Sequence, residues 1–198
     1  MRSQPPPTFP PARAAPRWAW LPLARRAPAE PVARQWIGGL LGRAPEALPL
    51  TRNPHGRPMF GPPLQHLDCN WSHSGDGLLV VLAEERCVGI DLEWVKPRPN
   101  ALALARRYFH ASEAAWLAAM QPPEREAAFL RLWCAKEAML KAHGRGLAFG
   151  LDRLALQAGP GGLQVSSCAG ELGAADDWSL LELTPAPGYV GALAWRCR

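Results

Sequence analysis

The sequence predicts an α+β protein made of two similar halves, each a small antiparallel sheet packed with helices. Three observations lead to this prediction. The chain has 198 residues, enough for one domain or two small lobes. Short strand patterns lie before and after a central run of helical patterns. Finally, residues 76–83 (DGLLVVLA) resemble residues 187–194 (PGYVGALA), which indicates an internal duplication.

The first third of the chain has few signals of regular structure. Residues 1–16 contain six prolines and predict a disordered or polyproline-like leader. Residues 32–41 favour a short helix weakened by two glycines, and proline and glycine make 51–63 a loop. We place an N-terminal lobe at 17–97 and a C-terminal lobe at 98–198, because prolines interrupt the chain near 96–100 (KPRPN).

A β-hairpin is predicted next. Residues 77–83 form a short apolar run, 84–86 a polar turn, and 87–94 (CVGIDLEW) alternate with a period of two. This alternation puts two sets of side chains on opposite faces of the second strand: Val88, Ile90 and Leu92 on one, Gly89, Asp91 and Glu93 on the other.

Helices and then strands complete the chain. We expect helices over 101–109 and 110–120, the second stopped by Pro122 and Pro123. The strongest helix signal covers 124–143 and ends at Gly144, a typical C-terminal residue. Strands are expected near 151–157, 163–168, 178–183 and 189–195.

Composition narrows the class of protein. With 48% hydrophobic and 20% charged residues, the chain is typical of a soluble globular protein. No run approaches the roughly 20 apolar residues that span a bilayer. The N-terminal arginines precede no apolar stretch, so we expect a cytoplasmic protein without a secretory signal. Five scattered cysteines predict reduced, mostly buried thiols rather than disulfides or a zinc site.

Positive charge is concentrated near the N-terminus. The net charge is +5, and residues 1–57 hold nine arginines against Glu30 and Glu46. This asymmetry favours an anionic partner, which could be nucleic acid, an acidic protein or a phosphorylated ligand. The alternative is a solvated, arginine-rich surface.

Three acidic residues are candidate metal ligands. Asp91 and Glu93 lie two apart on one strand face, roughly 6–7 Å along the strand. Carboxylates are depleted from strands, and a divalent cation such as Mg²⁺ would offset their repulsion. The alternative is an edge strand whose polar face meets water. Glu137 and Lys141, four apart on the long helix, could add a third carboxylate and a cation for phosphate. The alternative there is a surface salt bridge contributing about 0.3–0.5 kcal/mol.

Two further residues could donate to phosphate. His73 is flanked by two serine hydroxyls just before the predicted hairpin, and Arg57 lies in a Gly-Arg-Pro turn. Each signal is weak when taken singly.

Together these motifs resemble the 4′-phosphopantetheinyl transferase superfamily, in its longer surfactin-synthetase-activating type. The resemblance covers about residues 52–152. It rests on NWSHS at 70–74, GIDLE at 89–93, WCAKEAMLK at 133–141 and GRGL at 144–147. It implies a monomeric pseudo-dimer of two lobes. It also implies transfer of phosphopantetheine from coenzyme A to a serine of an acyl or peptidyl carrier protein, with release of 3′,5′-ADP.

The resemblance also implies a role for each site residue. Asp91, Glu93 and Glu137 would ligate Mg²⁺, and Lys141 would contact the pyrophosphate of coenzyme A. Ser72, His73, Arg57 and Lys136 would also bind coenzyme A, with Arg57 on the 3′-phosphate. Glu113, in YFHASE at 108–113, matches a family carboxylate associated with proton transfer, although His110 replaces the usual Ser or Thr. Either Glu113 or Glu137 could take the serine proton.

Two other functions fit parts of the pattern. A magnesium-dependent nuclease could use the carboxylates and the positive charge. However, the carboxylate–lysine pair lies on a helix, and no basic groove is predicted beyond the N-terminus. A non-catalytic binder of acidic proteins is the second alternative. We expect no nucleic-acid partner and no membrane association.

Overall fold

The computed structural model describes residues 15–198, so the predicted leader at 1–16 lies outside the described residues except for its last two. The described residues form ten strands and four α-helices. The strands are β1 Arg17–Pro22, β2 Leu50–Arg52, β3 Pro58–Phe60, β4 Leu67–Ser74, β5 Gly77–Glu84, β6 Arg86–Trp94, β7 Leu154–Gly159, β8 Gly162–Cys168, β9 Ser179–Leu183 and β10 Tyr189–Cys197. The helices are α1 Ala29–Leu41, α2 Ala101–Tyr108, α3 Ala111–Ala118 and α4 Pro122–His143.

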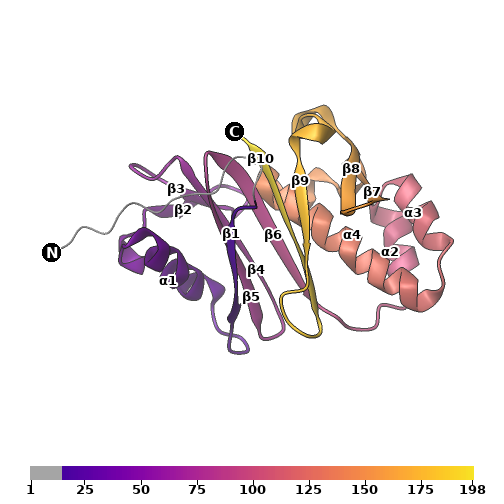
Figure 1. Ribbon diagram of the computed structural model, residues 1–198, viewed down its shortest axis with the longest axis horizontal. Helices are drawn as coiled ribbons and strands as arrows, with labels where there is room; N and C mark the ends of the chain where they lie inside the picture. Colours follow the sequence, from indigo (N-terminus) through magenta and orange to yellow (C-terminus); the bar gives the residue numbers. More distant parts are fainter. Residues whose placement is uncertain (1–14) are drawn as a thin grey trace.

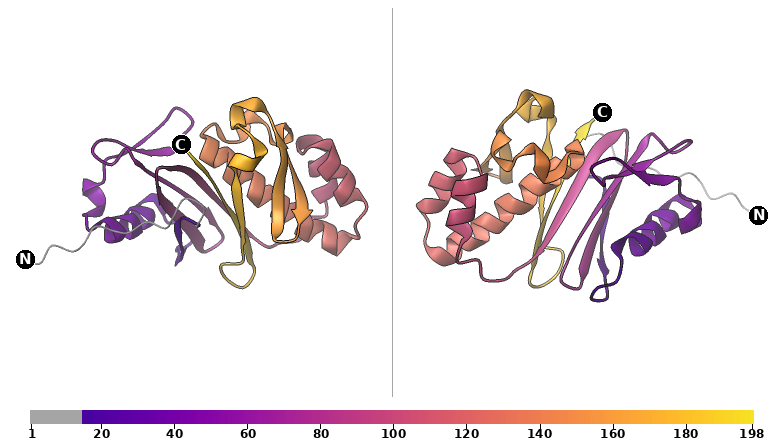
Figure 2. Two further views of the ribbon diagram at one scale, coloured as in Figure 1. Left: turned by 45° about the horizontal axis from the view of Figure 1, so that its top comes forward. Right: turned by 180° about the vertical axis from the view of Figure 1, so that it is seen from behind.

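Two antiparallel three-stranded sheets form the centre of the molecule. The N-terminal sheet has the order β1-β5-β4 and the C-terminal sheet the order β6-β10-β9. Helix α1 covers the outer side of the first sheet and α4 the outer side of the second, with α2 and α3 beyond α4 (Figure 1). The right-hand view of Figure 2 shows the same order of layers from behind. The predicted α+β class is confirmed.

Strand β5 explains how the two sheets pack. Successive side chains of a strand point to opposite faces. Leu78 and Val80 accordingly pack toward α1, whereas Leu79 and Val81 pack between the sheets against Ile90 of β6. Both faces of β5 are therefore buried, which is why its sequence is a continuous apolar run and not an alternating one.

The predicted pairing of 77–83 with 87–94 is wrong. Both strands exist, but β5 pairs with β4 and β1, and β6 pairs with β10. Between them Glu85 has a positive φ of 52° and redirects the chain from one sheet to the other. The true hairpin is β4–β5, so residues 70–74 lie in a strand that pairs with residues 77–81. The lobe boundary at 97 stays a prediction, although the change of sheet occurs at Glu85.

The sequence repeat has a structural counterpart. The segment at 76–83 forms β5, the central strand of the N-terminal sheet. The segment at 187–194 forms most of β10, the central strand of the C-terminal sheet. Each central strand has a helix on its outer side, α1 or α4. The two copies thus occupy equivalent places in two similar halves.

Helix α4 connects the core to the polar residues of the site. Pro122 and Pro123 were expected to end the preceding helix, and they occupy the first turn of α4. A proline there costs no hydrogen bond, because the N–H groups of a first turn have no partner within the helix. The helix lies directly on β6 at Gly89. A Cβ at this position would lie 2.1 Å from the Ala138 carbonyl oxygen and 2.4 Å from the Ala142 nitrogen. Gly89 therefore allows the close approach of helix and strand.

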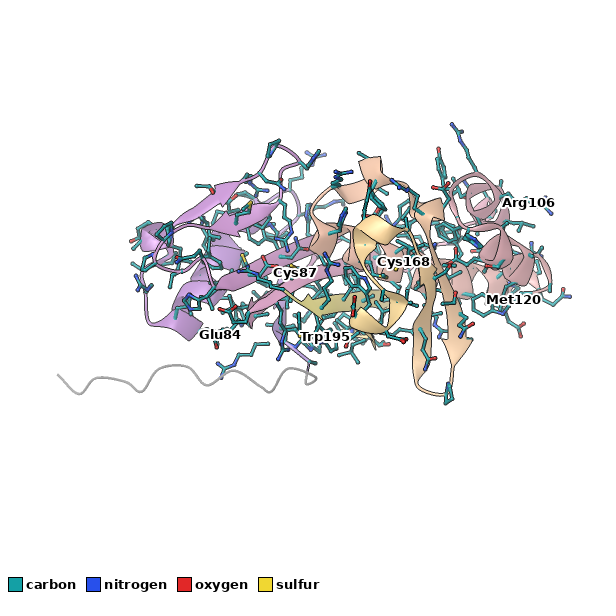
Figure 3. All side chains as sticks on the ribbon, turned by 90° about the horizontal axis from the view of Figure 1, so that it is seen from above. Glu84, Cys87, Arg106, Met120, Cys168 and Trp195 are labelled. Carbon is teal, nitrogen blue, oxygen red and sulfur yellow. The ribbon has the colours of Figure 1, made fainter. Side chains whose placement is uncertain are left out.

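Other expectations are confirmed or corrected in detail. The predicted helices match α1, α2, α3 and α4 to within a few residues, and the last four strands match β7 to β10. The 51–63 loop contains the short paired strands β2 and β3. All five cysteines are free, but only Cys69 and Cys134 are buried; Figure 3 shows Cys87, which is partly exposed, between the two halves. Within residues 15–198, no helix combines the length and apolar character needed to cross a membrane.

Candidate active site

The edge of β6 is covered by polar side chains of β4 instead of by a partner strand. Even-numbered residues of β4 point toward β6, and three of them accept hydrogen bonds from its backbone. The bonds run from Val88 N–H to Asp68 Oδ2 at 2.8 Å, Ile90 N–H to Asn70 Oδ1 at 3.1 Å, and Trp94 N–H to Ser74 Oγ at 3.0 Å. We call these three bonds the polar ladder. They satisfy backbone N–H groups of β6 that would otherwise lie unpaired at a sheet edge.

Ser72 belongs to the same face of β4 but bonds a side chain. Its hydroxyl donates to Asp91 Oδ1 at 2.8 Å and accepts from Lys141 Nζ at 2.9 Å. Lys141 Nζ also donates to Asp91 Oδ1 at 2.6 Å and to the Ile90 carbonyl at 3.2 Å. Asp91 is buried, and its Oδ2 has no hydrogen-bond partner among the residues that the structure describes.

Glu137 and Glu93 share the region around Asp91. Burial and the charge of Asp91 raise the pKa of Glu137 from 4.5 to about 7, although Lys141 opposes the rise. Burial and Asp91 also raise the pKa of Glu93, opposed by Arg98, whose Nη2 lies 3.1 Å from Glu93 Oε2. The negative charge of Asp91 thus disfavours ionisation of both glutamates, which places Glu93 and Glu137 within electrostatic reach of Asp91.

These residues fit a magnesium ion. A buried carboxylate oxygen without a partner is costly, and a divalent cation would satisfy Asp91 Oδ2 while offsetting the excess negative charge. Over residues 15–198 no three His, Cys, Asp or Glu side chains are already gathered closely enough to hold a metal. Water and substrate phosphates would therefore complete the coordination, as is usual for magnesium.

A cleft of about 300 Å³ opens beside these side chains. Both halves of the chain contribute to it: Arg52, His55, Gly56, Arg57, Pro58, Asn70 and Trp71 from the first, and Glu137, Lys141, Gly144, Gly146 and Leu147 from the second. The Arg52 guanidinium lies 5.4 Å from the centre of the Trp71 ring. The lining thus combines cations and an aromatic ring with a carboxylate, a chemistry suited to a phosphorylated ligand.

Comparison with known proteins decides the family. Residues 87–193, more than half of the chain, match the model of the 4′-phosphopantetheinyl transferase superfamily. The chain belongs to this superfamily. It is 36% identical to the 4′-phosphopantetheinyl transferase AcpT of Salmonella typhimurium over 170 residues, 83% of each protein. It is 33% identical to HetI of Nostoc over 165 residues, which are 82% of this chain and 67% of HetI. A Bacillus subtilis 4′-phosphopantetheinyl transferase is 31% identical over 116 residues, 59% of this chain and 50% of that protein.

The chain is thus a 4′-phosphopantetheinyl transferase, and the two alternatives of nuclease and non-catalytic binder are not supported. The predicted site residues of the transferase divide into three groups. Ser72, Asp91, Glu93, Glu137 and Lys141 come together between β4, β6 and α4. Their roles in binding and catalysis remain proposals.

His73 and Arg57 form the second group. His73 is exposed and, because neighbours on a strand alternate, lies on the face of β4 opposite to Ser72. It is not among the residues that line the cleft. Arg57 does line the cleft, but protein atoms accept bonds from all of its nitrogens. Their assignment to coenzyme A stays a prediction.

Glu113 and Lys136 form the third group; their side chains are buried, and their expected contacts with substrate stay predictions. They make an ion pair with 2.7 Å between Lys136 Nζ and Glu113 Oε2, and both side chains have zero exposure. Lys136 also donates to the Leu151 and Leu154 carbonyls, and Glu113 accepts from the Leu156 N–H. Burial raises the pKa of Glu113 and lowers that of Lys136, and each charge opposes the change in the other. The pair is buried in the C-terminal half, and neither residue lines the cleft between β4, β6 and α4.

Sequence reasoning missed Asp68 and Asn53, which hold the parts of the transferase together around the site. Asp68 accepts from Arg57 and from β6, and Asn53 Nδ2 donates to the Gly144 carbonyl. A signal for Asp68 was present. Residues 67–74 (LDCNWSHS) place a polar residue at every second position, which predicts a strand with one polar face.

Proposed function

We propose that the transferase moves the 4′-phosphopantetheine group of coenzyme A onto a serine of an acyl or peptidyl carrier protein and releases 3′,5′-ADP. One observation carries this proposal. Asp91, Glu93 and Glu137 share one buried region, and Lys141 is bonded to Asp91 at the wall of a cleft large enough for part of a nucleotide. Family membership supplies the reaction class.

In this proposal the pyrophosphate of coenzyme A lies in the cleft near Lys141. Asp91, Glu93 and Glu137 would hold magnesium, which when bound offsets the charge of the pyrophosphate oxygens. Lys141 lines the cleft with its side chain 25% exposed, and it would exchange one of its three present acceptors, Ser72 Oγ, Asp91 Oδ1 and the Ile90 carbonyl, for a phosphate oxygen. Ser72 keeps the Asp91 carboxylate oriented through its hydroxyl.

The transfer step then follows. The carrier serine oxygen attacks the phosphorus that bears pantetheine, forming a new P–O bond. The bond from that phosphorus to the bridging oxygen breaks, and 3′,5′-ADP departs with the electron pair. Glu137, whose carboxylate lines the cleft, takes the serine proton, since Glu113 is buried in its ion pair with Lys136. The Lys141 ammonium stabilises the charge that develops on the phosphate oxygens.

Mass spectrometry tests the reaction. Several apo carrier proteins would each be mixed with the transferase, coenzyme A and magnesium. We expect at least one carrier to gain the mass of one phosphopantetheine group, and the relative rates would rank the carriers. If none of the acyl or peptidyl carriers gains this mass, the proposed substrate class is wrong.

We also propose that the transferase works as a monomer in the cytoplasm without a nucleic-acid partner, since two similar halves already supply both walls of the cleft. Sedimentation at micromolar concentration, with and without coenzyme A, tests the monomer. A dimer under both conditions would contradict it.

A further inference from the structure

Arg57 is held by the protein at every donor position. Its Nε donates to the Lys141 carbonyl at 2.7 Å. Its Nη1 donates to the Pro58 carbonyl at 3.1 Å and Asp68 Oδ1 at 2.9 Å, and its Nη2 to Asp68 Oδ2 at 2.6 Å and the Val88 carbonyl at 2.8 Å. A guanidinium has five N–H donors, so this set uses all of them. A phosphate could bind Arg57 only by displacing one of these partners.

Asp68 completes the pair from the other side. Besides the bidentate contact with Arg57, its Oδ2 accepts from the Val88 N–H at 2.8 Å and its Oδ1 from the Cys69 N–H at 3.1 Å. The side chains of Arg57 and Asp68 are only 10% and 7% exposed. A buried charge pair with every donor and acceptor engaged holds its neighbours in fixed positions.

Asn53 ties the same turn to the end of α4. Its Oδ1 accepts from the backbone N–H groups of His55 and Arg57, both at 2.9 Å, which folds residues 53–57 into a turn. Its Nδ2 donates to the Gly144 carbonyl at 3.1 Å. The carbonyls at a helix C-terminus have no partners within the helix and carry partial negative charge. Asn53 and Arg57 together satisfy two carbonyls at this end.

We propose that Arg57, together with Asp68 and Asn53, is a positioning residue for the site and not a ligand of the coenzyme A phosphates. These three residues, the Arg57 clamp, hold both elements that carry the site. On α4 they bind the carbonyl of Lys141 itself; on β6 they bind the N–H and carbonyl of Val88, three residues before Asp91. The clamp therefore sets the separation between the Lys141 ammonium and the Asp91 carboxylate. Its kinetic test rests on the proposed function.

Two variants and two substrates separate the roles. Asp68→Asn weakens the clamp at a residue that does not itself line the cleft, and Arg57→Lys keeps the charge but loses the five-donor geometry. Coenzyme A is compared with dephospho-coenzyme A, which lacks the 3′-phosphate. If the clamp positions the site, both variants lose kcat/KM on the order of 100-fold, by the same factor with both substrates.

A phosphate ligand would give a different pattern. Asp68→Asn would then free Arg57 and leave the KM for coenzyme A unchanged or lower. Arg57→Lys would reduce the preference for coenzyme A over dephospho-coenzyme A. Either result, obtained with folded protein, overturns the clamp. Should Asp68→Asn not fold, the substrate ratio of Arg57→Lys still decides.

The matched control is Glu182→Gln. Glu182 also makes a bidentate pair with an arginine of α4, Arg131, at 2.6 and 3.0 Å, and also accepts a backbone N–H, from Leu163. Glu182 lies on β9, Arg131 lies ten residues before Lys141 on α4, and neither residue lines the cleft. We expect wild-type kinetics. A variant that only loses stability has a smaller active fraction but an unchanged KM for coenzyme A. The clamp variants are expected to raise this KM.

Calorimetric titration with coenzyme A tests the Arg57 clamp separately from the proposed transfer reaction. If wild-type protein binds coenzyme A but modifies no carrier, the proposed function fails, and the affinities of the variants still test the clamp. We expect weaker coenzyme A binding in both clamp variants and none of this loss in Glu182→Gln. Equal affinity in all proteins contradicts the clamp even if transfer is active.

Discussion

Replacing Glu137 by glutamine should make the metal-free transferase less sensitive to pH. Burial and the Asp91 charge raise the pKa of Glu137 from 4.5 to about 7. A carboxyl with a raised folded-state pKa holds its proton more tightly when folded, so its contribution to stability is lost as pH rises from about 4.5 to about 7. Each pKa unit corresponds to about 1.4 kcal/mol, so ionising Glu137 costs the folded state about 3 kcal/mol. Glutamine does not ionise and removes this loss.

Urea unfolding in EDTA at pH 5 and pH 8 measures the effect. Between these pH values the free energy of unfolding should fall more in wild type than in Glu137→Gln, by about 2–3 kcal/mol, because part of the loss has already occurred at pH 5. Glu93, whose pKa is also raised by burial and Asp91, contributes in the same direction in both proteins, so their difference isolates Glu137. Magnesium should then stabilise wild type at pH 8 more than the variant.

Glu124→Gln is the control, because Glu124 is an exposed carboxylate in the first turn of the same helix. It should keep the wild-type pH dependence. If Glu137→Gln also keeps it, Glu137 does not share a region with Asp91 and Glu93, and the reasoning about the site fails.

The remaining predictions concern catalysis and packing. Asp91→Asn should abolish carrier modification by mass spectrometry while keeping the circular dichroism spectrum; full turnover in magnesium would contradict the metal assignment. Gly89→Ala adds a Cβ against the backbone of α4 and should lower kcat/KM on the order of 100-fold, whereas near-normal rates would show that α4 shifts without harm. Glu113→Gln leaves Lys136 buried without its counter-charge and should destabilise the fold by about 3–5 kcal/mol in urea unfolding, with turnover per folded molecule retained. Loss of turnover in fully folded Glu113→Gln would restore a catalytic role. The double variant Glu113→Leu with Lys136→Met should recover most of the stability.

Local patterns in the sequence predicted much of the fold. The alternation at 87–94 assigned Asp91 and Glu93 to one face of a strand, and Val88, Ile90 and Leu92 do share the other face, which packs between the sheets. The 3.6-residue period placed Glu137 and Lys141 on one face of a helix that ends at Gly144. These inferences succeeded because they depend only on neighbours within one element.

Inferences that depend on distant neighbours failed or stayed open. Nothing within 77–94 shows that β10, about 100 residues later, is the partner of β6. Glu113 and Lys136 have residue types suited to catalysis, but they form a buried ion pair between α3 and α4. The Leu156 N–H of β7 also donates to Glu113. The sequence pattern of one helix does not reveal these contacts. The sequence assigned Arg57 to phosphate because nothing near it in the chain shows that Asp68, on β4, is its counter-ion.

The polar ladder has a consequence for the angle between the two sheets. A carboxyl or an amide reaches one bond further from the backbone than a serine hydroxyl. Since Asp68, Asn70 and Ser74 make bonds of similar length, β4 and β6 must diverge from Ser74 toward Asp68. Asn70 lines the cleft on the wider side. Two long side chains and one short side chain thus act as spacers of unequal length, and exchanging a long spacer for a short one would narrow the cleft between the two halves.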